Sequence, residues 1–270
     1  MTTGPPRRSR LPSVQVALAA AVGTLRRYPF VLASAAGAVA AAIVTLEHGA
    51  DGAALRLVLA ATLGIPLFVA LATFATGRGD APAIRWGPSA LALLPLAGFF
   101  LAADGWSEQV LVRRYAQTSL GLHALVAVLA WVGRDQPNGF WQFNRRLFER
   151  FLVSALFSAV LFLGLALALA ALDKLFGIEI DEDTYARLWC VVAFLFNTWY
   201  FLGGLPRRYD DLDRSTDYPA GLRIFSQYIL VPLVLVYLLI LTAYLVRVAV
   251  THEWPSGWIG FLVSGVSVLG

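Results

Sequence analysis

Long runs of uncharged residues alternate with short polar segments along most of the chain. Seven runs lack Asp, Glu, Lys and Arg, and each has roughly the 20 residues that cross a bilayer core about 30 Å thick as an α-helix. They cover residues 30–46, 57–77, 86–103, 115–133, 151–172, 188–205 and 224–246. An eighth apolar run, 255–270, is shorter and reaches the last residue. The pattern predicts seven full transmembrane spans and a partial or short eighth.

The runs are helical rather than stranded in character. They are rich in Leu, Ala and Val and lack the alternation of apolar and polar residues that a membrane β-strand shows. Composition agrees, because 59% of the residues are hydrophobic and 14% are charged, whereas about 25% of the residues of a soluble domain are charged. The predicted fold class is all-α, a polytopic transmembrane helical bundle.

Positive charge is distributed unevenly between the two sets of loops. With the N-terminus in the cytoplasm, fifteen of the 21 Lys and Arg residues fall in inner segments and six in outer segments. Short cytoplasmic loops carry such an excess, so we predict a cytoplasmic N-terminus. The abundance of Ala, Gly and Arg with a single Lys is typical of a high-GC bacterial gene, which indicates a multi-pass protein of the bacterial inner membrane.

The N-terminal region is expected to be separate from the membrane domain. Residues 1–28 are predicted to form a cytoplasmic tail and an interfacial helix, and residues 29–270 the transmembrane domain. The alternative for this region is a signal peptide, because basic residues precede about twelve apolar ones.

An amphipathic segment, residues 140–151, leads directly into the fifth run. A helix here gathers aromatic side chains on one face, including Phe143 and Phe148, and places polar groups such as Glu149 on the other. Such a helix suits a membrane surface, with its rings in the acyl boundary and its guanidinium groups near lipid phosphate. The alternative is an ordinary helical extension with a solvated basic face.

A second polar segment, 206–228, lies on the same predicted side of the membrane. Together the two segments indicate an interaction surface for anionic lipid headgroups or a cytoplasmic protein. Its candidate residues are Trp141, Asn144, Arg145, Arg146, Arg207, Arg208 and Arg223.

Small residues and prolines inside the runs predict local packing and kinks. Ala33, Gly37 and Ala41 share one helix face in the first run, and Ser154 and Ser158 share one in the fifth, which favours close contact with neighbouring helices. Prolines interrupt the second, third and seventh runs and predict kinks there. They are Pro66, Pro95 and Pro232.

No run contains a charged residue, although proton relays and ion-coupled transporters usually place such groups near the midplane. The candidate intramembrane polar residues are His123, Asn197 and Gln227. Hydrogen bonding between helices is the default role of such residues. A polar path past them and past the kinked spans is the alternative.

Recognisable catalytic chemistry is absent from the sequence. There is no Walker loop, G-x-S-x-G, H-E-x-x-H or Rossmann glycine pattern. The single cysteine, Cys190, lies inside a run, which excludes a disulfide framework and a Cys-based zinc site. We therefore predict no catalytic residue, no metal site, no cofactor and no nucleic-acid partner. His123 with Ser154 or Ser158 stays open as a serine-type pair that any bundle could offer by chance.

Four separated motifs resemble the bacterial membrane family of domain of unknown function DUF4153. They are WQFNRRLF (141–148), FNTWYFLGGLP (196–206), DYPAGLRIFSQYILVPL (217–233) and EWPSGWIGFLVSGVSVLG (253–270), so residues 139–270 carry the resemblance. The resemblance implies a multi-span inner-membrane protein, with no established activity whose residues could be carried over. Members of the family are typically longer, so this sequence is expected to be a C-terminally truncated one.

These observations favour a structural, interaction or envelope-signalling membrane protein that presents its inner polar surface to a partner or to anionic lipid. A permease-like transporter of a small solute is the alternative and requires a continuous polar cavity. A membrane enzyme on a lipid-linked substrate is a weaker alternative, for which the outer acids Asp173, Glu179 and Asp183 are candidates. The oligomeric state does not follow from the sequence.

Overall fold

The computed structural model describes residues 14–49, 52–176, 179–209 and 211–213, together with seven separate positions between 231 and 250. The chain divides into two compact units, Met1–Ser215 and Thr216–Gly270, and the description below concerns the first. Three residues named in the sequence analysis lie outside the described residues, namely Arg223, Gln227 and Pro232. The same is true of most of the run predicted at 224–246 and of the whole run at 255–270.

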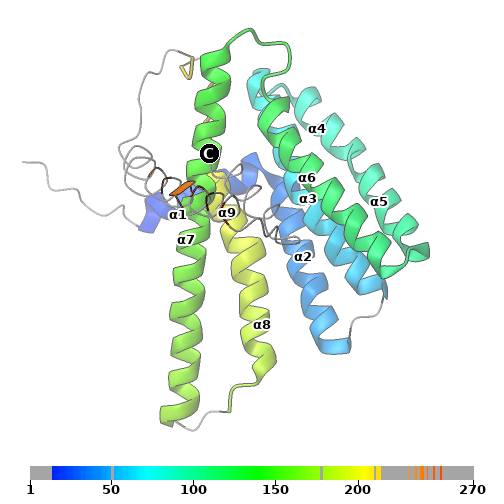
Figure 1. Cartoon of the computed structure of the whole chain (residues 1–270), viewed down its shortest axis with the longest axis vertical. Coiled ribbons are helices and arrows are strands. Elements are labelled where there is room, and N and C mark those ends of the chain that lie inside the picture. The colour runs from blue at the N-terminus through cyan, green and yellow to red at the C-terminus, as the bar shows by residue number, and fades with distance from the viewer. Residues whose placement is uncertain are drawn as a thin grey trace, which may run out of the picture. The chain divides into compact units, whose positions relative to one another are not determined.

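The first unit is built from helices, with no strand among the residues described (Figure 1). The order along the chain is α1 (Val14–Arg27), α2 (Pro29–His48), α3 (Gly52–Gly77), α4 (Pro82–Leu91), α5 (Leu93–Ala102), the short η1 (Ala103–Gly105), α6 (Glu108–Leu129), α7 (Pro137–Phe176), α8 (Glu182–Cys190), η2 (Val191–Phe196) and α9 (Asn197–Gly203). The segments α8, η2 and α9 follow one another without a break and run beside α7.

Within the described residues, five helical stretches are long and apolar enough to cross a membrane. They are Pro29–His48, Gly52–Gly77, Pro82–Gly105, Pro137–Ala170 and Glu182–Gly203. They coincide with the first, second, third, fifth and sixth runs of the sequence pattern. The fourth run falls on α6, which is not among the five and begins with Glu108, Arg113 and Arg114 in its first two turns. For the described residues, an all-helical fold with several candidate spans is therefore confirmed, and the count of seven stays a prediction.

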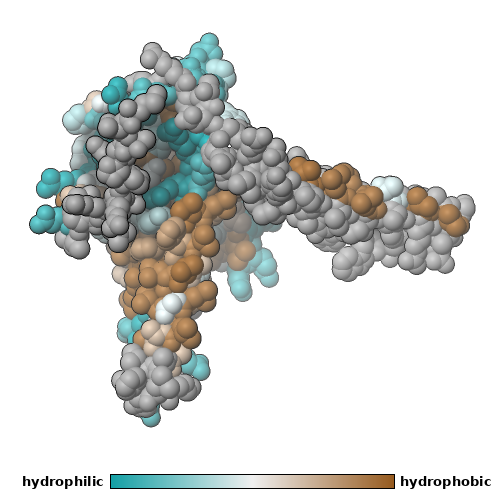
Figure 2. Space-filling view, turned by 90° about the vertical axis from the view of Figure 1, so that its left-hand side faces the viewer, coloured by the Kyte–Doolittle hydropathy of each residue, from teal (hydrophilic) through white to brown (hydrophobic). Residues whose placement is uncertain are grey.

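The lower part of α7 carries a broad apolar surface. Leu156, Val160, Leu163 and Leu167 are each more than 60% exposed. Figure 2 shows hydrophobic surface in this lower region and hydrophilic residues gathered above it. Exposed apolar surface of this extent is costly in water and is normal for a helix that faces lipid.

Helices α2 and α3 approach each other closely because small residues line their contact. A side chain at Gly64 would overlap the hydroxyl of Ser34, which itself donates to the carbonyl oxygen of Ala61 over 3.0 Å. Ala41 is buried as predicted, but Ala33 is exposed. The contact face predicted in the first run is thus only partly correct, because the helix turns Ala33 away from α3.

The structure describes two of the three prolines for which kinks are predicted; the break near Pro95 is observed, and the kink at Pro66 stays a prediction. Pro95 cannot donate to the carbonyl of Leu91, four residues earlier, and the helix breaks there into α4 and α5, separated by Ala92. Pro66 is buried inside α3, which continues through it.

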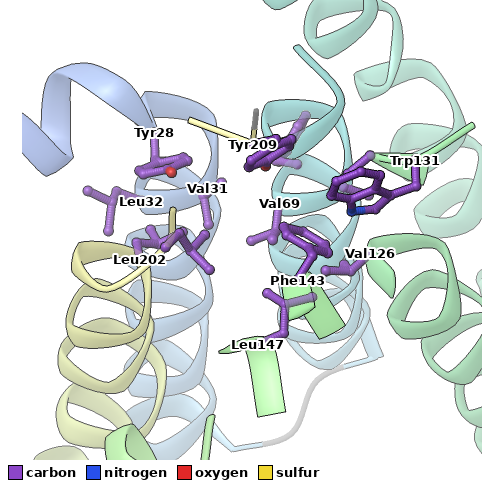
Figure 3. Close-up of a cluster of buried hydrophobic side chains, with 14 of the residues drawn as sticks. Tyr28, Val31, Leu32, Val69, Val126, Trp131, Phe143, Leu147, Leu202 and Tyr209 are labelled. Carbon is purple, nitrogen blue, oxygen red and sulfur yellow. The ribbon is translucent and has the colours of Figure 1, made fainter. Parts of the chain in front are cut away.

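The core of the unit is an aromatic cluster where α6, α7 and the segment after α9 meet (Figure 3). The ring of Phe143 lies 6.2 Å from that of Trp131 and 5.2 Å from that of Tyr209, centroid to centroid. Phe143 is completely buried and Leu147 is 9% exposed. These contacts place the first turns of α7 inside the protein.

The amphipathic segment 140–151 is helical, as predicted, but its faces have other neighbours. Phe143 and Leu147 were expected to enter lipid, and that is wrong because Trp131, Tyr209 and neighbouring helices surround them. Arg145 was expected at the headgroups, yet it is only 8% exposed and donates to Glu149 over 3.4 Å. Phe140, Phe148 and Phe151 do remain exposed.

Candidate functional site

Helices α1, α3, α6 and α9 finish close together, and arginines from neighbouring segments bind their last carbonyl oxygens. Arg85 donates to the carbonyls of Arg26 (2.7 Å) and Arg27, Arg78 to Val132 (3.0 Å), Arg134 to Gly77, and Arg150 to Tyr200 and Phe201 (3.4 Å). Arg27 reaches Thr76 and the carbonyl of Pro206, at 3.2 Å in each case. We call this region, with Arg27, Arg78, Arg85, Arg134 and Arg150, the arginine-rich end.

Elementary electrostatics explains this arrangement. The last four carbonyl groups of an α-helix lack partners within the helix, and its C-terminus carries about half a negative charge. Guanidinium groups satisfy these oxygens and oppose that charge. These arginines, for which the sequence predicts a cytoplasmic position, therefore also hold the helix ends together.

The loop after α9 closes over the same end. Asn138 donates through its side-chain amide to the carbonyl of Asp213 over 2.6 Å, and the backbone N–H of Gly139 donates to the Asp213 carboxylate over 2.8 Å. Tyr28 and Tyr209 are each 3% exposed here, and burial raises the pKa of both phenols above the ordinary value of 10.0. Nearby arginine, chiefly Arg27, offsets part of that rise in pKa.

An open cleft of about 610 Å³ lies beside this loop. We call it the arginine cleft, and its lining residues are Thr76, Gly77, Arg78, Gly79, Asp80, Arg134, Arg207, Arg208 and Tyr209. Four arginines and one carboxylate, that of Asp80, thus line the cleft, and Thr76 donates to this carboxylate over 3.2 Å. Arg207 and Arg208 are exposed. Such an excess of positive charge suits a phosphate or carboxylate group.

The described residues of the predicted interaction surface lie at different places in the structure, and Arg223 is outside the described residues. Arg207 and Arg208 line the arginine cleft, whereas Asn144 lines a different cavity. Trp141 is 47% exposed and Arg146 is half-buried. The buried Arg145 is not available as a surface contact, which corrects that part of the prediction.

The second cavity is a groove of about 410 Å³ between α3, α6, α7 and α9. We call it the interhelical groove, and its lining residues are Ile65, Pro66, Val69, His123, Val126, Ala127, Asn144, Leu147, Phe148, Phe151, Ser154, Asn197, Thr198 and Phe201. It brings together two of the predicted intramembrane polar residues, His123 and Asn197, and one predicted kink. None of the lining residues is Asp, Glu, Lys or Arg.

Side chains of the groove are held by specific hydrogen bonds. The hydroxyl of Ser158 on α7 donates to Asn197 Oδ1 over 3.2 Å, which confirms the packing role predicted for this serine. Asn144 Nδ2 donates to the carbonyls of Ala127 (3.1 Å) and Phe140 (3.0 Å). His123 Nδ1 lies 2.7 Å from the carbonyl of Ser119, one turn earlier in α6.

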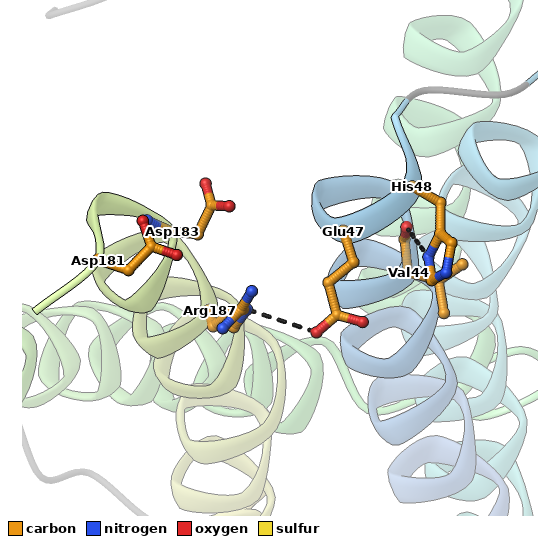
Figure 4. Close-up of polar contacts among 6 residues, drawn as sticks. All are labelled: Val44, Glu47, His48, Asp181, Asp183 and Arg187. Carbon is orange, nitrogen blue, oxygen red and sulfur yellow. Dashed lines mark hydrogen bonds and ion pairs between the residues drawn. The ribbon is translucent and has the colours of Figure 1, made fainter.

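The opposite end of the unit carries two ion pairs. Arg56 pairs with Asp104, and Arg187 Nε lies 3.6 Å from Glu47 Oε1 (Figure 4). Asp181 accepts from the backbone N–H of Asp183 over 3.4 Å and caps α8. These pairs join segments that are predicted to be outer, and the arginine-rich end joins segments that are predicted to be inner. No cluster of three or more His, Cys, Asp or Glu side chains occurs among the residues described, so the outer acids do not form one there.

Comparison with known proteins adds one match. The profile of a family described as "Domain of unknown function (DUF4153)" matches residues 31–263. No curated protein and no solved structure matches the chain significantly.

Proposed function

We propose that this chain, which belongs to the DUF4153 family, is a bacterial inner-membrane protein that binds anionic lipid headgroups in the arginine cleft. The observation that carries the proposal is that four arginines and a single aspartate line a cleft of about 610 Å³. In this proposal the protein has a structural or envelope-signalling role, and its N-terminus is cytoplasmic.

Arg207 and Arg208 are the decisive residues of the cleft. Arg78 and Arg134 donate to the carbonyls of Val132 and Gly77, so replacing either of them would also disturb the fold. Arg207 and Arg208 are exposed and follow the end of α9 by four and five residues. A phosphate at this position would lie near the end of the apolar helices, where headgroups meet a bilayer core.

The experiment compares lipid binding by two matched double variants. Purified full-length protein in detergent is titrated with phosphatidylglycerol and with phosphatidylcholine, and bound lipid is counted by native mass spectrometry. Arg207→Gln with Arg208→Gln is expected to abolish the preference for phosphatidylglycerol. The control, Arg113→Gln with Arg114→Gln, also removes two arginines that are consecutive in the sequence. These arginines line another cleft, together with Trp106, Gln117 and Thr118.

Salt gives a second readout, because exposed charges are screened at high ionic strength. We expect the preference of the unaltered protein for phosphatidylglycerol over phosphatidylcholine to decrease when salt is raised from about 50 to about 500 mM. These concentrations lie on either side of the one at which the Debye length is about 10 Å. An unchanged preference in the Arg207 and Arg208 variant would contradict the proposal.

Orientation is tested with the one native cysteine removed. In a Cys190→Ser background, Arg207→Cys should react with a membrane-impermeant maleimide only after the cells are opened. Arg113→Cys should react in intact cells, because it lies on the predicted outer side. The reverse pattern would overturn the proposed orientation.

The permease-like alternative has less support. Its polar residues His123 and Asn197 do share the interhelical groove, but nine of the fourteen lining residues are apolar. A small polar solute needs a polar path through the hydrocarbon region. Headgroup binding at the arginine cleft is therefore preferred.

A further inference from the structure

We propose that the interhelical groove binds an uncharged amphiphile, a hydrocarbon chain that carries a hydroxyl or carbonyl group. This ligand class differs from the anionic headgroup of the arginine cleft, and the two sites share no lining residue. The proposal does not depend on headgroup binding.

The walls of the groove determine the apolar part of the ligand. Ile65 and Val69 of α3, Val126 of α6, and Leu147 and Phe201 give it apolar sides, and Figure 3 shows Val69, Val126 and Leu147 near one another. A volume of about 410 Å³ is within the range of small-molecule sites. A charged ligand would lose its hydration here without an opposite charge in return.

The groove is open towards the side of the bundle. Phe148 and Phe151, which line it, are 50% and 54% exposed, and His123 on α6 is exposed as well. Pro66 places the groove near the middle of α3, a candidate membrane span. A ligand that enters from the hydrocarbon region would therefore reach the groove without crossing water.

Polar atoms in the groove define the ligand's polar group. Only the NH₂ of Asn144 can donate to its two carbonyl partners, which leaves the Oδ1 of Asn144 as an acceptor. Asn197 accepts from Ser158 through Oδ1 and retains its NH₂ as a donor. Thr198 is 7% exposed and lines the same groove, so its hydroxyl is a further polar group there. A hydroxyl or carbonyl group could satisfy these atoms where water is scarce.

The backbone before Asn197 is itself unusual. Residues Val191–Phe196 form the π-helical segment η2, which ends directly before Asn197. π-Helical turns are rare, and they occur frequently at functional sites. This wider turn sets the direction in which Asn197 and Thr198 leave the helix, towards α7 and the groove.

The experiment uses a photoreactive probe, a sixteen-carbon alcohol that bears a diazirine in its chain. Full-length protein in detergent is irradiated with the probe, and labelled peptides are identified by mass spectrometry. We expect labelling of groove residues on α6 and α7 that excess hexadecanol suppresses. Labelling spread evenly over the exposed face of α7, with no suppression by hexadecanol, would overturn the proposal.

Two alanines of α6 provide a matched pair of variants. Ala127 lines the groove, whereas Ala124 is exposed and does not. Ala127→Phe should fill the groove and reduce groove labelling at least fivefold, and Ala124→Phe should change it less than twofold. Equal labelling in both variants would contradict the proposal.

A third variant separates loss of binding from loss of fold. Thr198→Val keeps the shape of the side chain and removes its hydroxyl. It should weaken binding of the alcohol about fivefold, the effect of one lost hydrogen bond, and leave binding of the matched diazirine alkane unchanged. An equal effect on both probes would show that the hydroxyl is not recognised. Arg207→Gln with Arg208→Gln should leave labelling intact, so failure of the headgroup site is distinguishable from failure of this one.

Discussion

Arg78 and Arg134 clamp the ends of two helices to each other in a reciprocal manner. Arg78 follows α3 and donates to the carbonyl of Val132 beyond α6 over 3.0 Å, while Arg134, beyond α6, donates to the carbonyl of Gly77 at the end of α3. Each side chain therefore satisfies a carbonyl in the other's segment. The pair joins two helix ends that are more than 50 residues apart in the sequence.

Breaking one half of this clamp should destabilise the protein measurably. Arg134→Gln is expected to lower the free energy of unfolding by about 2 kcal/mol, the usual size for a hydrogen bond from a charged donor. Arg134→Lys keeps the charge but loses the planar fork, so it should recover only part of this. Thermal unfolding in detergent, followed by circular dichroism, gives the comparison. Arg113→Gln is the control, and an equal effect there would argue against a specific clamp.

Close approach of α2 and α3 should make Gly64 intolerant of a side chain. Gly64→Ala is expected to cost about 2 kcal/mol, because the added carbon overlaps the hydroxyl of Ser34. Gly98 is also helical, but a side chain there meets nothing within 4 Å. Gly98→Ala should therefore be neutral or stabilising by up to about 1 kcal/mol. Adding Ser34→Ala to Gly64→Ala should restore part of the loss, and the absence of any such recovery would place the strain elsewhere.

Burial of Tyr28 and Tyr209 should make the fold sensitive to alkaline pH. Their phenols have a raised pKa in the folded protein, so the unfolded chain loses these protons first. Their contribution to stability is full below the ordinary pKa of 10.0 and falls as pH rises from there through the raised folded-state pKa.

The prediction is checked by measuring the unfolding midpoint at pH values from about 8 to about 11, a range that spans the ordinary pKa of about 10. The unaltered protein is compared with the double variant Tyr28→Phe and Tyr209→Phe. The unaltered protein should lose stability more steeply than the variant above pH 10. Parallel curves would show that neither phenol contributes.

The ion pair between Glu47 and Arg187 should contribute little. Both side chains are more than a third exposed and the closest N–O distance is 3.6 Å, so solvent screens the attraction. We expect Glu47→Gln to change the free energy of unfolding by less than about 0.5 kcal/mol. A larger, salt-dependent loss in the same thermal assay would indicate that this pair does stabilise the end opposite the arginine-rich end.

The sequence predicts the helices well because a helix in lipid needs a long uncharged run. Local chemistry alone predicts the helix break near Pro95, between α4 and α5, and the packed helix face at Ser158. Phe143 shows where this reasoning stops. Apolar side chains are equally suitable against lipid or against another helix, so hydropathy cannot tell that this ring belongs to the core.

The cavities depend on residues far apart in the chain. Asn144 was assigned to a headgroup surface, yet it lines the same groove as Asn197, 53 residues later. No local sequence pattern marks the π-helical turn that precedes Asn197. Similarly, positive-inside counting finds the arginines but not their carbonyl partners, because those partners come from other helices.

Helix α7 continues without interruption for 40 residues, which corresponds to about 60 Å. That length is about twice the hydrocarbon thickness of a bilayer. Between Asn138 and Phe176 it contains no proline, the residue that most often kinks a helix. Arg150 ties its upper part to the end of α9. A tilt of about 5° at Arg150 would therefore move the far end of the helix by roughly 3 Å, given about 1.5 Å per residue over the part that follows Arg150.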